Sequence, residues 1–153
     1  MGKYKLIAAC AITCMLVSCS TAQETQLEKA FTAISEIDGF ETFNREQIVE
    51  LGWNEDDPRL SEELGEVMMA LCGNADPREQ FLAILEDIPA GMLYGETRDE
   101  RDKITRYYTE TDAMGIGYFL FTFVGWGGND TVAMLYKGRD EGFYKALLDG
   151  DAD

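Results

Sequence analysis

The stretch Ile116-Gly117-Tyr118-Phe119-Leu120-Phe121-Thr122-Phe123-Val124 decides how the rest of the chain must be arranged. Successive side chains of a strand point to opposite faces, so the three phenylalanines would share one face and the residues between them the other. Both faces would be mostly apolar. This pattern predicts a central strand that helices cover on one side and partly on the other, and its length excludes a membrane span.

The residues that follow predict a hairpin and a closing helix. Residues 125–130 read Gly-Trp-Gly-Gly-Asn-Asp, which supplies the glycine, asparagine and aspartate that tight turns favour. Residues 131–137 would return as the antiparallel partner strand. After Gly138, helical spacing is seen in Phe143, Tyr144, Leu147 and Leu148.

Upstream of the hairpin, apolar residues at three- and four-residue steps predict further helices. The first runs over residues 24–37. A short extended piece at residues 40–43 precedes a short helix that the capping pair Asn44 and Gln47 would open. The next helix would begin after Asp57-Pro58 and end at Gly73, with its apolar stripe made of Leu60, Leu64, Val67, Met68 and Leu71.

Another helix is expected from Asp76-Pro77 to Ile88, because Pro89 prevents it from continuing. Residues 90–94 then read as a short strand. Thr97 and Glu100 have the spacing of a capping box, which would open a helix carrying Ile104, Tyr107 and Tyr108. The sequence therefore predicts an α+β fold: a small, mostly antiparallel sheet of three or four strands, packed by four or five helices, in a single domain over residues 27–149.

The N-terminal residues have the layout of a secretory signal, with Lys3 and Lys5 before an apolar run over residues 6–17. The run is too short for a transmembrane anchor. The sequence Leu16-Val17-Ser18-Cys19 closes it and fits an ordinary secretory cleavage site poorly. It resembles the lipobox of bacterial lipoproteins, which implies a signal peptide over residues 1–18, lipid attachment at Cys19 and a tether over residues 19–26.

The chain also resembles a family of small uncharacterised α/β lipoproteins of Gram-negative bacteria, which is a family of unknown function. The matching parts are the leader with Cys19, the strand and capped helix over residues 90–110, and the terminal hairpin with Gly138 and the last helix. This resemblance implies a lipid-anchored protein of the cell envelope, in the outer membrane. It implies no activity.

The composition excludes several classes of function. The chain has 29 acidic and 13 basic residues and a formal net charge of −16, which repels nucleic acids and anionic lipid headgroups. This acidity suits a cationic partner or calcium, or it serves solubility alone. The chain has no histidine, so histidine-dependent catalytic sites and imidazole-bound metal centres are absent. We expect no cofactor and no metal, and the acidic residues 150–153 read as a tail.

Few residues stand out as functional candidates. Cys72 lies in an apolar pattern and reads as a buried thiol. Turn chemistry does not explain Trp126, which either folds back onto the sheet or is displayed for a protein partner. The sequence predicts a membrane-anchored binding or accessory module. The alternative is a carboxylate-dependent envelope hydrolase, for which the sequence singles out no pair of acids.

Overall fold

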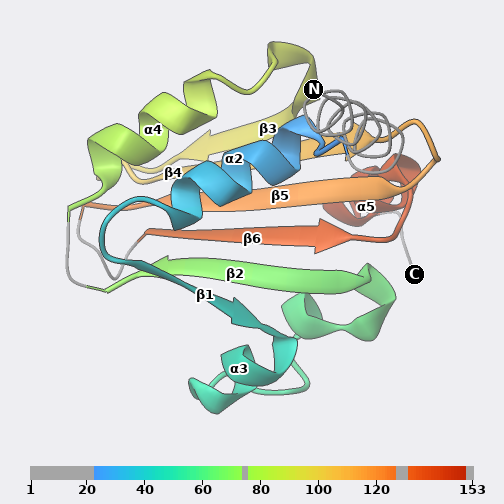
Figure 1. Cartoon of the computed structure of the whole chain (residues 1–153), viewed down its shortest axis with the longest axis horizontal. Helices are drawn as coiled ribbons and strands as arrows, with labels where there is room; N and C mark the ends of the chain where they lie inside the picture. Colours follow the sequence, from blue (N-terminus) through green and yellow to red (C-terminus); the bar gives the residue numbers. More distant parts are fainter. Residues whose placement is uncertain (1–22, 74–75, 127–130, 151–153) are drawn as a thin grey trace, which may run out of the picture.

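A computed structural model describes residues 23–73, 76–126 and 131–150 of the chain. Its central feature is a sheet of six antiparallel strands in the order β1-β2-β6-β5-β4-β3 (Figure 1). The last four strands follow one another as a meander, to which β2 and then β1 are added beside β6. The strands are β1 (Phe40–Asn44), β2 (Glu66–Cys72), β3 (Leu93–Arg98), β4 (Ile104–Thr111), β5 (Gly117–Val124) and β6 (Thr131–Lys137).

Helices lie on both faces of this sheet. In Figure 1, α2 (Gln26–Ser35) and α4 (Arg78–Glu86) lie across the near face, and α5 (Glu141–Asp149) lies behind it. The short α3 (Arg45–Glu50) lies at the β1 edge, close to the 3-10 turns Pro58–Leu60 and Glu62–Leu64. A third 3-10 turn, Ala90–Met92, leads into β3. None of the described helices is long and apolar enough to cross a membrane.

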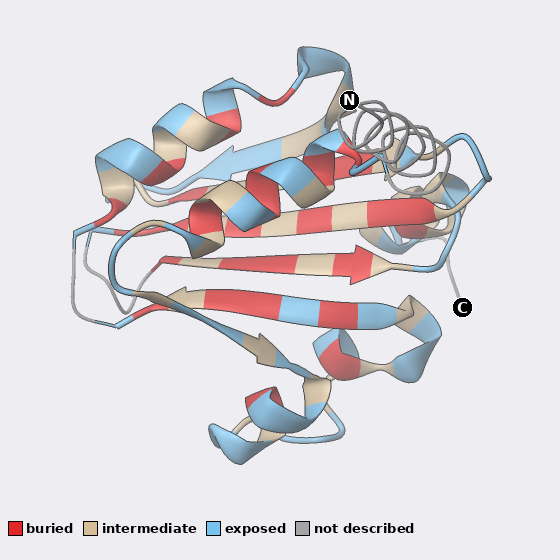
Figure 2. Cartoon of the chain, in the orientation of Figure 1, coloured by how far each residue is buried: buried red, intermediate tan, exposed pale blue. Residues whose placement is uncertain are grey.

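Two apolar cores result, one on each face, because side chains alternate along each strand. The first core lies under α2 and α4, where Phe31 and Phe81 pack with Leu120 of β5. The second core lies on the opposite face, where Ile48 of α3 and Tyr144 of α5 are buried with Met134 of β6. Figure 2 shows alternating burial along the central strands, whereas no residue of the edge strand β3 is buried.

Several predicted elements are confirmed. The stretch at residues 116–124 forms β5, and it pairs with β6 as the expected hairpin partner from Val124↔Thr131 to Tyr118↔Lys137. Residues 127–130 of the connecting turn lie outside the described residues. The capping box of Asn44 and Gln47 opens α3, and a second box of Thr25 and Glu28 opens α2. Helices α4 and α5 also form where their apolar spacing predicts them.

The prediction of a sheet of three or four strands is wrong, because the sheet has six strands. The described residues form four α-helices. Two segments that were expected to be helical are strands. The helix expected over residues 58–73 is replaced by two 3-10 turns and β2, so Cys72 is buried in a strand rather than in a helix. The capped helix expected after Thr97 is replaced by the end of β3, a turn and β4.

Gly65 explains why a helix cannot continue into residues 66–72. Its φ is +86°, a backbone conformation that favours glycine. A Cβ at this position would lie 2.2 Å from the Lys137 carbonyl oxygen, so the backbones of residues 65 and 137 approach too closely for any other residue. Met69 and Ala70 then point to opposite cores, and both are fully buried.

Cover on both faces of the sheet explains why β4 was expected to be a helix. Tyr107 and Tyr108 are neighbours that point to opposite faces of a sheet covered on both sides, so their spacing from Ile104 imitates one apolar stripe of a helix. The expected capping box is not formed. Asp99 organises the turn instead, and its carboxylate accepts hydrogen bonds from the backbone N–H groups of Arg101 and Lys103 at 2.8 and 2.9 Å.

Candidate functional site

The face of the sheet that carries α5 has a row of aromatic side chains. The strand register places Phe121 opposite Tyr107 and Phe119 opposite Tyr136, all on this one face. The ring centroid of Tyr107 lies 6.0 Å from the ring centroid of Phe119 and 5.6 Å from that of Phe121. Tyr144 of α5 stacks on Phe119 at 5.2 Å, so the helix extends the row above the sheet. Such ring pairs stabilise one another beyond the apolar area that they bury.

A pocket of about 280 Å³ opens over these rings. The sheet forms its floor, the C-terminal half of α5 forms one wall and the turn at residues 58–64 forms the other. Almost all of the lining is apolar or aromatic. The lining residues are Pro58, Arg59, Leu64, Tyr107, Phe119, Phe121, Tyr136, Tyr144, Leu147 and Leu148.

The hydroxyl groups of two tyrosines in the lining donate to the pocket's own wall. The Tyr136 hydroxyl donates to the Arg59 carbonyl oxygen at 2.7 Å, and the Tyr144 hydroxyl donates to the Leu64 carbonyl oxygen at 2.9 Å. Burial raises the pKa of both groups, so both stay neutral at physiological pH. These bonds fix the turn above the sheet and leave the ring faces as an apolar wall.

Arg59 is the one charged residue in the lining, and neighbouring groups already hold it. Its guanidinium forms an ion pair with Asp57 at 2.8 Å and lies 4.5 Å from the centroid of the Trp53 ring. Hydrogen bonds from the Arg59 side chain and backbone lower the pKa of Asp57, which therefore stays ionised. The pocket thus has an apolar interior and a charged rim.

A larger and more open hollow of about 450 Å³ lies on another part of the surface, where Arg45 and Lys137 are among the lining residues. The Arg45 guanidinium donates to the carbonyl oxygens of Leu60, Ser61 and Gly65. These bonds hold the chain around the 3-10 turns in place. We therefore take the aromatic pocket, whose lining is mostly apolar, as the candidate site.

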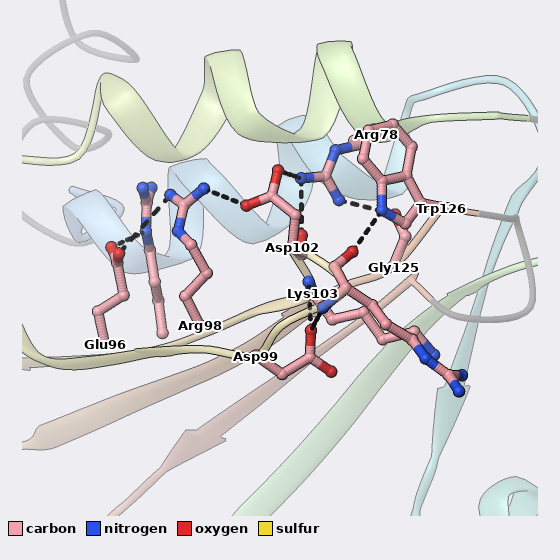
Figure 3. A network of polar contacts seen from close by, with 10 residues as sticks. Arg78, Glu96, Arg98, Asp99, Asp102, Lys103, Gly125 and Trp126 are labelled. Carbon is pink, nitrogen blue, oxygen red and sulfur yellow. Dashed lines mark hydrogen bonds and ion pairs between the residues drawn. The ribbon is translucent and has the colours of Figure 1, made fainter.

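Trp126, the residue singled out in the sequence, follows the end of β5, is not part of this pocket's lining and is 56% exposed. Its indole N–H donates to the Arg101 carbonyl oxygen at 2.7 Å, and the Arg78 guanidinium lies 4.0 Å from the centroid of its ring (Figure 3). Its ring is therefore folded against Arg78 at the surface and is not part of either core. Cys19, the predicted lipid attachment site, lies outside the described residues.

Arg78 is the centre of the network in Figure 3. Its guanidinium donates to the carbonyl oxygen of Gly125 at 3.2 Å and to the carbonyl and carboxylate oxygens of Asp102 at 2.8 and 3.1 Å. Asp102 has a φ of +60°, and its carboxylate also pairs with Arg98. The network joins the start of α4, the β3–β4 turn and the end of β5, which indicates a structural role.

The described residues offer little support for the hydrolase alternative. The carboxyl groups of Asp57, Asp99, Asp112 and Glu141 have lowered pKa values, owing mainly to hydrogen bonds that they accept, so each favours its ionised form. A general acid needs a raised pKa instead. Within residues 23–73, 76–126 and 131–150, no group of three or more acidic or cysteine side chains could hold a metal ion.

Comparison with known proteins gives no further guide to the site. No protein-family model, no curated protein and no solved structure matches the chain. The resemblance to uncharacterised lipoproteins therefore stays a prediction from the leader and the layout of the chain.

The sequence contained part of the signal for the pocket. The alternation of Phe119, Phe121 and Phe123 predicts an apolar sheet face with partial cover, and the spacing of Tyr144, Leu147 and Leu148 predicts the helix that lies over it. The spacing of Tyr107 from Ile104 predicts a helix, so the sequence does not indicate β4, the third strand of the floor. The sequence does not predict that the turn at residues 58–64 lines the pocket either. The place of this turn depends on how β2 and β6 pair in the sheet.

Proposed function

We propose that the protein is a lipid-anchored binding module of the bacterial envelope, and that the aromatic pocket takes the apolar part of its ligand. The pocket itself is the observation that carries this proposal. An apolar cavity with a few polar groups at its rim is the usual form of a binding site. Its walls are held by hydrogen bonds from Tyr136 and Tyr144, so the cavity exists before the ligand arrives.

The volume limits what can enter. An apolar cavity of about 150 Å³ binds benzene, whereas drug-sized ligands occupy roughly 300–1,000 Å³. At about 280 Å³, the pocket suits one bicyclic ring or one large apolar side chain. Burial of such a group contributes about 1.5–3 kcal/mol, which alone corresponds to binding weaker than ~1 mM. The ligand must therefore also contact the protein outside the pocket.

Lipid anchoring is supported by the sequence Leu16-Val17-Ser18-Cys19. One acyl chain gives marginal membrane binding, whereas two or more give stable anchoring. Replacing Cys19 by alanine should abolish labelling with a fatty-acid analogue, and the protein should leave the membrane fraction or keep its leader. Continued lipid labelling of this variant would contradict the assignment of Cys19.

The pocket is tested with a neutral apolar dye, N-phenyl-1-naphthylamine, whose fluorescence rises in apolar surroundings. Both cores and all six strands lie within residues 23–150, so the Cys19→Ala chain without its leader retains the folded unit and needs no detergent. Fluorescence that rises in proportion to the protein concentration is expected, and its slope compares the affinities of the variants. Leu147→Trp should reduce the affinity at least ten-fold, because the larger ring would fill the cavity.

The matched control is Leu93→Trp. Leu147 and Leu93 are each 40% exposed, but Leu93 lies on the edge strand and is not part of the pocket lining. The control should bind the dye as the parent chain does. Equal dye affinity in all three proteins would show that the pocket is not the binding site.

A further inference from the structure

A second hollow of about 380 Å³ lies beside the aromatic pocket. The two share Pro58, Leu64 and Leu147 in their lining, so a ligand that reaches past these side chains can contact both. The second hollow differs sharply in chemistry, because its remaining lining includes four carboxylates. These belong to Glu55, Asp56, Asp57 and Glu63.

Three of these carboxylates are available to a ligand. Asp57 is held by Arg59, whereas Glu55, Asp56 and Glu63 are exposed and form none of the ion pairs found among the described residues. The nearby cation Arg139 is in none of the ion pairs found among the described residues. Its guanidinium lies 4.7 Å from the Phe143 ring centroid and donates to the backbone carbonyl oxygen of Glu63.

The rim is therefore negative next to an apolar interior, and the whole chain carries a net charge of −16. Such a field attracts cations over a distance of about a Debye length and repels anionic lipids and nucleic acids. Charge complementarity and the adjacency of the two hollows thus favour a ligand with a bulky apolar group beside positive charge.

We propose that the occupant is a basic peptide segment of a partner protein. One large apolar side chain fills the aromatic pocket, and neighbouring lysine or arginine side chains lie among Glu55, Asp56 and Glu63. This inference rests on the proposed function, because it requires the pocket to be a binding site. It adds the chemistry of the ligand and a dependence on salt.

The test uses three acetylated and amidated heptapeptides with the leaderless Cys19→Ala chain. The first has a central phenylalanine flanked by lysines, the second has alanine in place of phenylalanine, and the third has glutamates in place of the lysines. Calorimetry should give at least ten-fold tighter binding for the first than for the other two. Raising the salt concentration from about 50 to 300 mM should weaken this binding several-fold.

Variants that remove carboxylates show which of them cause the preference for the lysine peptide. The triple variant Glu55→Gln, Asp56→Asn, Glu63→Gln should lose the preference for lysine but keep its affinity for the neutral dye. The control variant Glu36→Gln, Asp38→Asn, Glu41→Gln removes the same number of charges from exposed residues outside both hollows and should keep the preference.

The outcomes separate the two proposals. If the dye binds but the lysine and glutamate peptides bind equally, the inference about a basic partner is overturned and the proposed function stands. If neither dye nor peptide binds, both fail. An equal loss in the control variant, or tighter binding of the small amine phenethylammonium than of the peptide, would also overturn a basic peptide as the occupant.

Discussion

At the scale of single residues, Trp126 shows how an exposed aromatic can be fixed without being buried. Its ring lies against Arg78, and its N–H donates to the Arg101 carbonyl oxygen, while 56% of the residue stays exposed. A cation–π contact at an exposed site contributes about 0.5–1 kcal/mol, and a hydrogen bond contributes about 1 kcal/mol. A fully buried tryptophan would contribute more to the free energy of unfolding.

We therefore expect Trp126→Ala to lower the free energy of unfolding by about 1–2 kcal/mol, rather than the ~3–5 kcal/mol of a core aromatic. Trp126→Phe should recover the ring contact and lose only the hydrogen bond. Urea unfolding measures both. A loss of ~3 kcal/mol or more in the alanine variant would place the ring in the core and contradict this account.

Asp112 shows how one carboxylate shapes a turn. It accepts hydrogen bonds from the N–H groups of Met114 and Ile116, each at 2.9 Å, and from the Tyr118 hydroxyl at 3.2 Å. The bond from Ile116 is the main cause of its lowered pKa, and the bonds from Met114 and Tyr118 act in the same direction. The ionised carboxylate is thus favoured in the folded chain.

A lowered pKa in the folded state gives stability that is fully present above the unfolded-state pKa of about 3.9 and is lost as the pH falls through the folded-state pKa. Asp112→Asn should therefore unfold at a lower temperature than the parent at pH 7. The difference should shrink below about pH 4. A difference that stays constant from pH 7 to pH 2 would show that the charge of Asp112 does not contribute.

At the scale of elements, the sequence predicted helices well where one face is polar, as in α2 and α5. It failed at β2 and β4, which are covered on both faces. Apolar side chains then occur at adjacent positions such as Tyr107 and Tyr108, and their spacing fits a helical period by coincidence. The abundance of threonine, tyrosine and isoleucine in residues 104–111 was the signal that favoured a strand.

The pocket was predictable only in part, because one of its walls depends on strands that are distant in the sequence. The aromatic face of β5 follows from alternation within one segment of sequence. The wall at residues 58–64 depends on Gly65, whose close approach to Lys137 depends on the pairing of β2 with β6. Pairing between residues more than 60 positions apart, as in β2 and β6, leaves no local pattern in the chain.

Arg78 gives the sharpest test of how elements are joined. Its side chain is only 11% exposed and donates to oxygens of Asp102 and Gly125. Lysine lacks the planar fork that serves these acceptors together, so Arg78→Lys should cost about 2–3 kcal/mol. The control Arg98→Lys changes a 48% exposed side chain and should cost about 1 kcal/mol or less. Equal losses in urea unfolding would show that Arg78 does not join α4 to the turns.

At the scale of the whole molecule, the two faces of the sheet are covered differently. Helices α2 and α4 lie across one face, while α5 lies behind the other (Figure 1). The aromatic pocket is lined by residues of α5 and of the turn at residues 58–64. The central claim is that this opening is where the ligand binds.

An NMR titration of the leaderless Cys19→Ala chain with indole tests that claim most directly, since indole is neutral and matches the size of the pocket. We predict that backbone amide signals at Leu64, Leu147 and Leu148 shift with increasing indole concentration, while those of Phe31 and Leu85 on the opposite face stay unchanged. Shifts centred on the α2 and α4 face, or no shifts at Leu64, Leu147 and Leu148 up to the solubility limit of indole, would contradict the account.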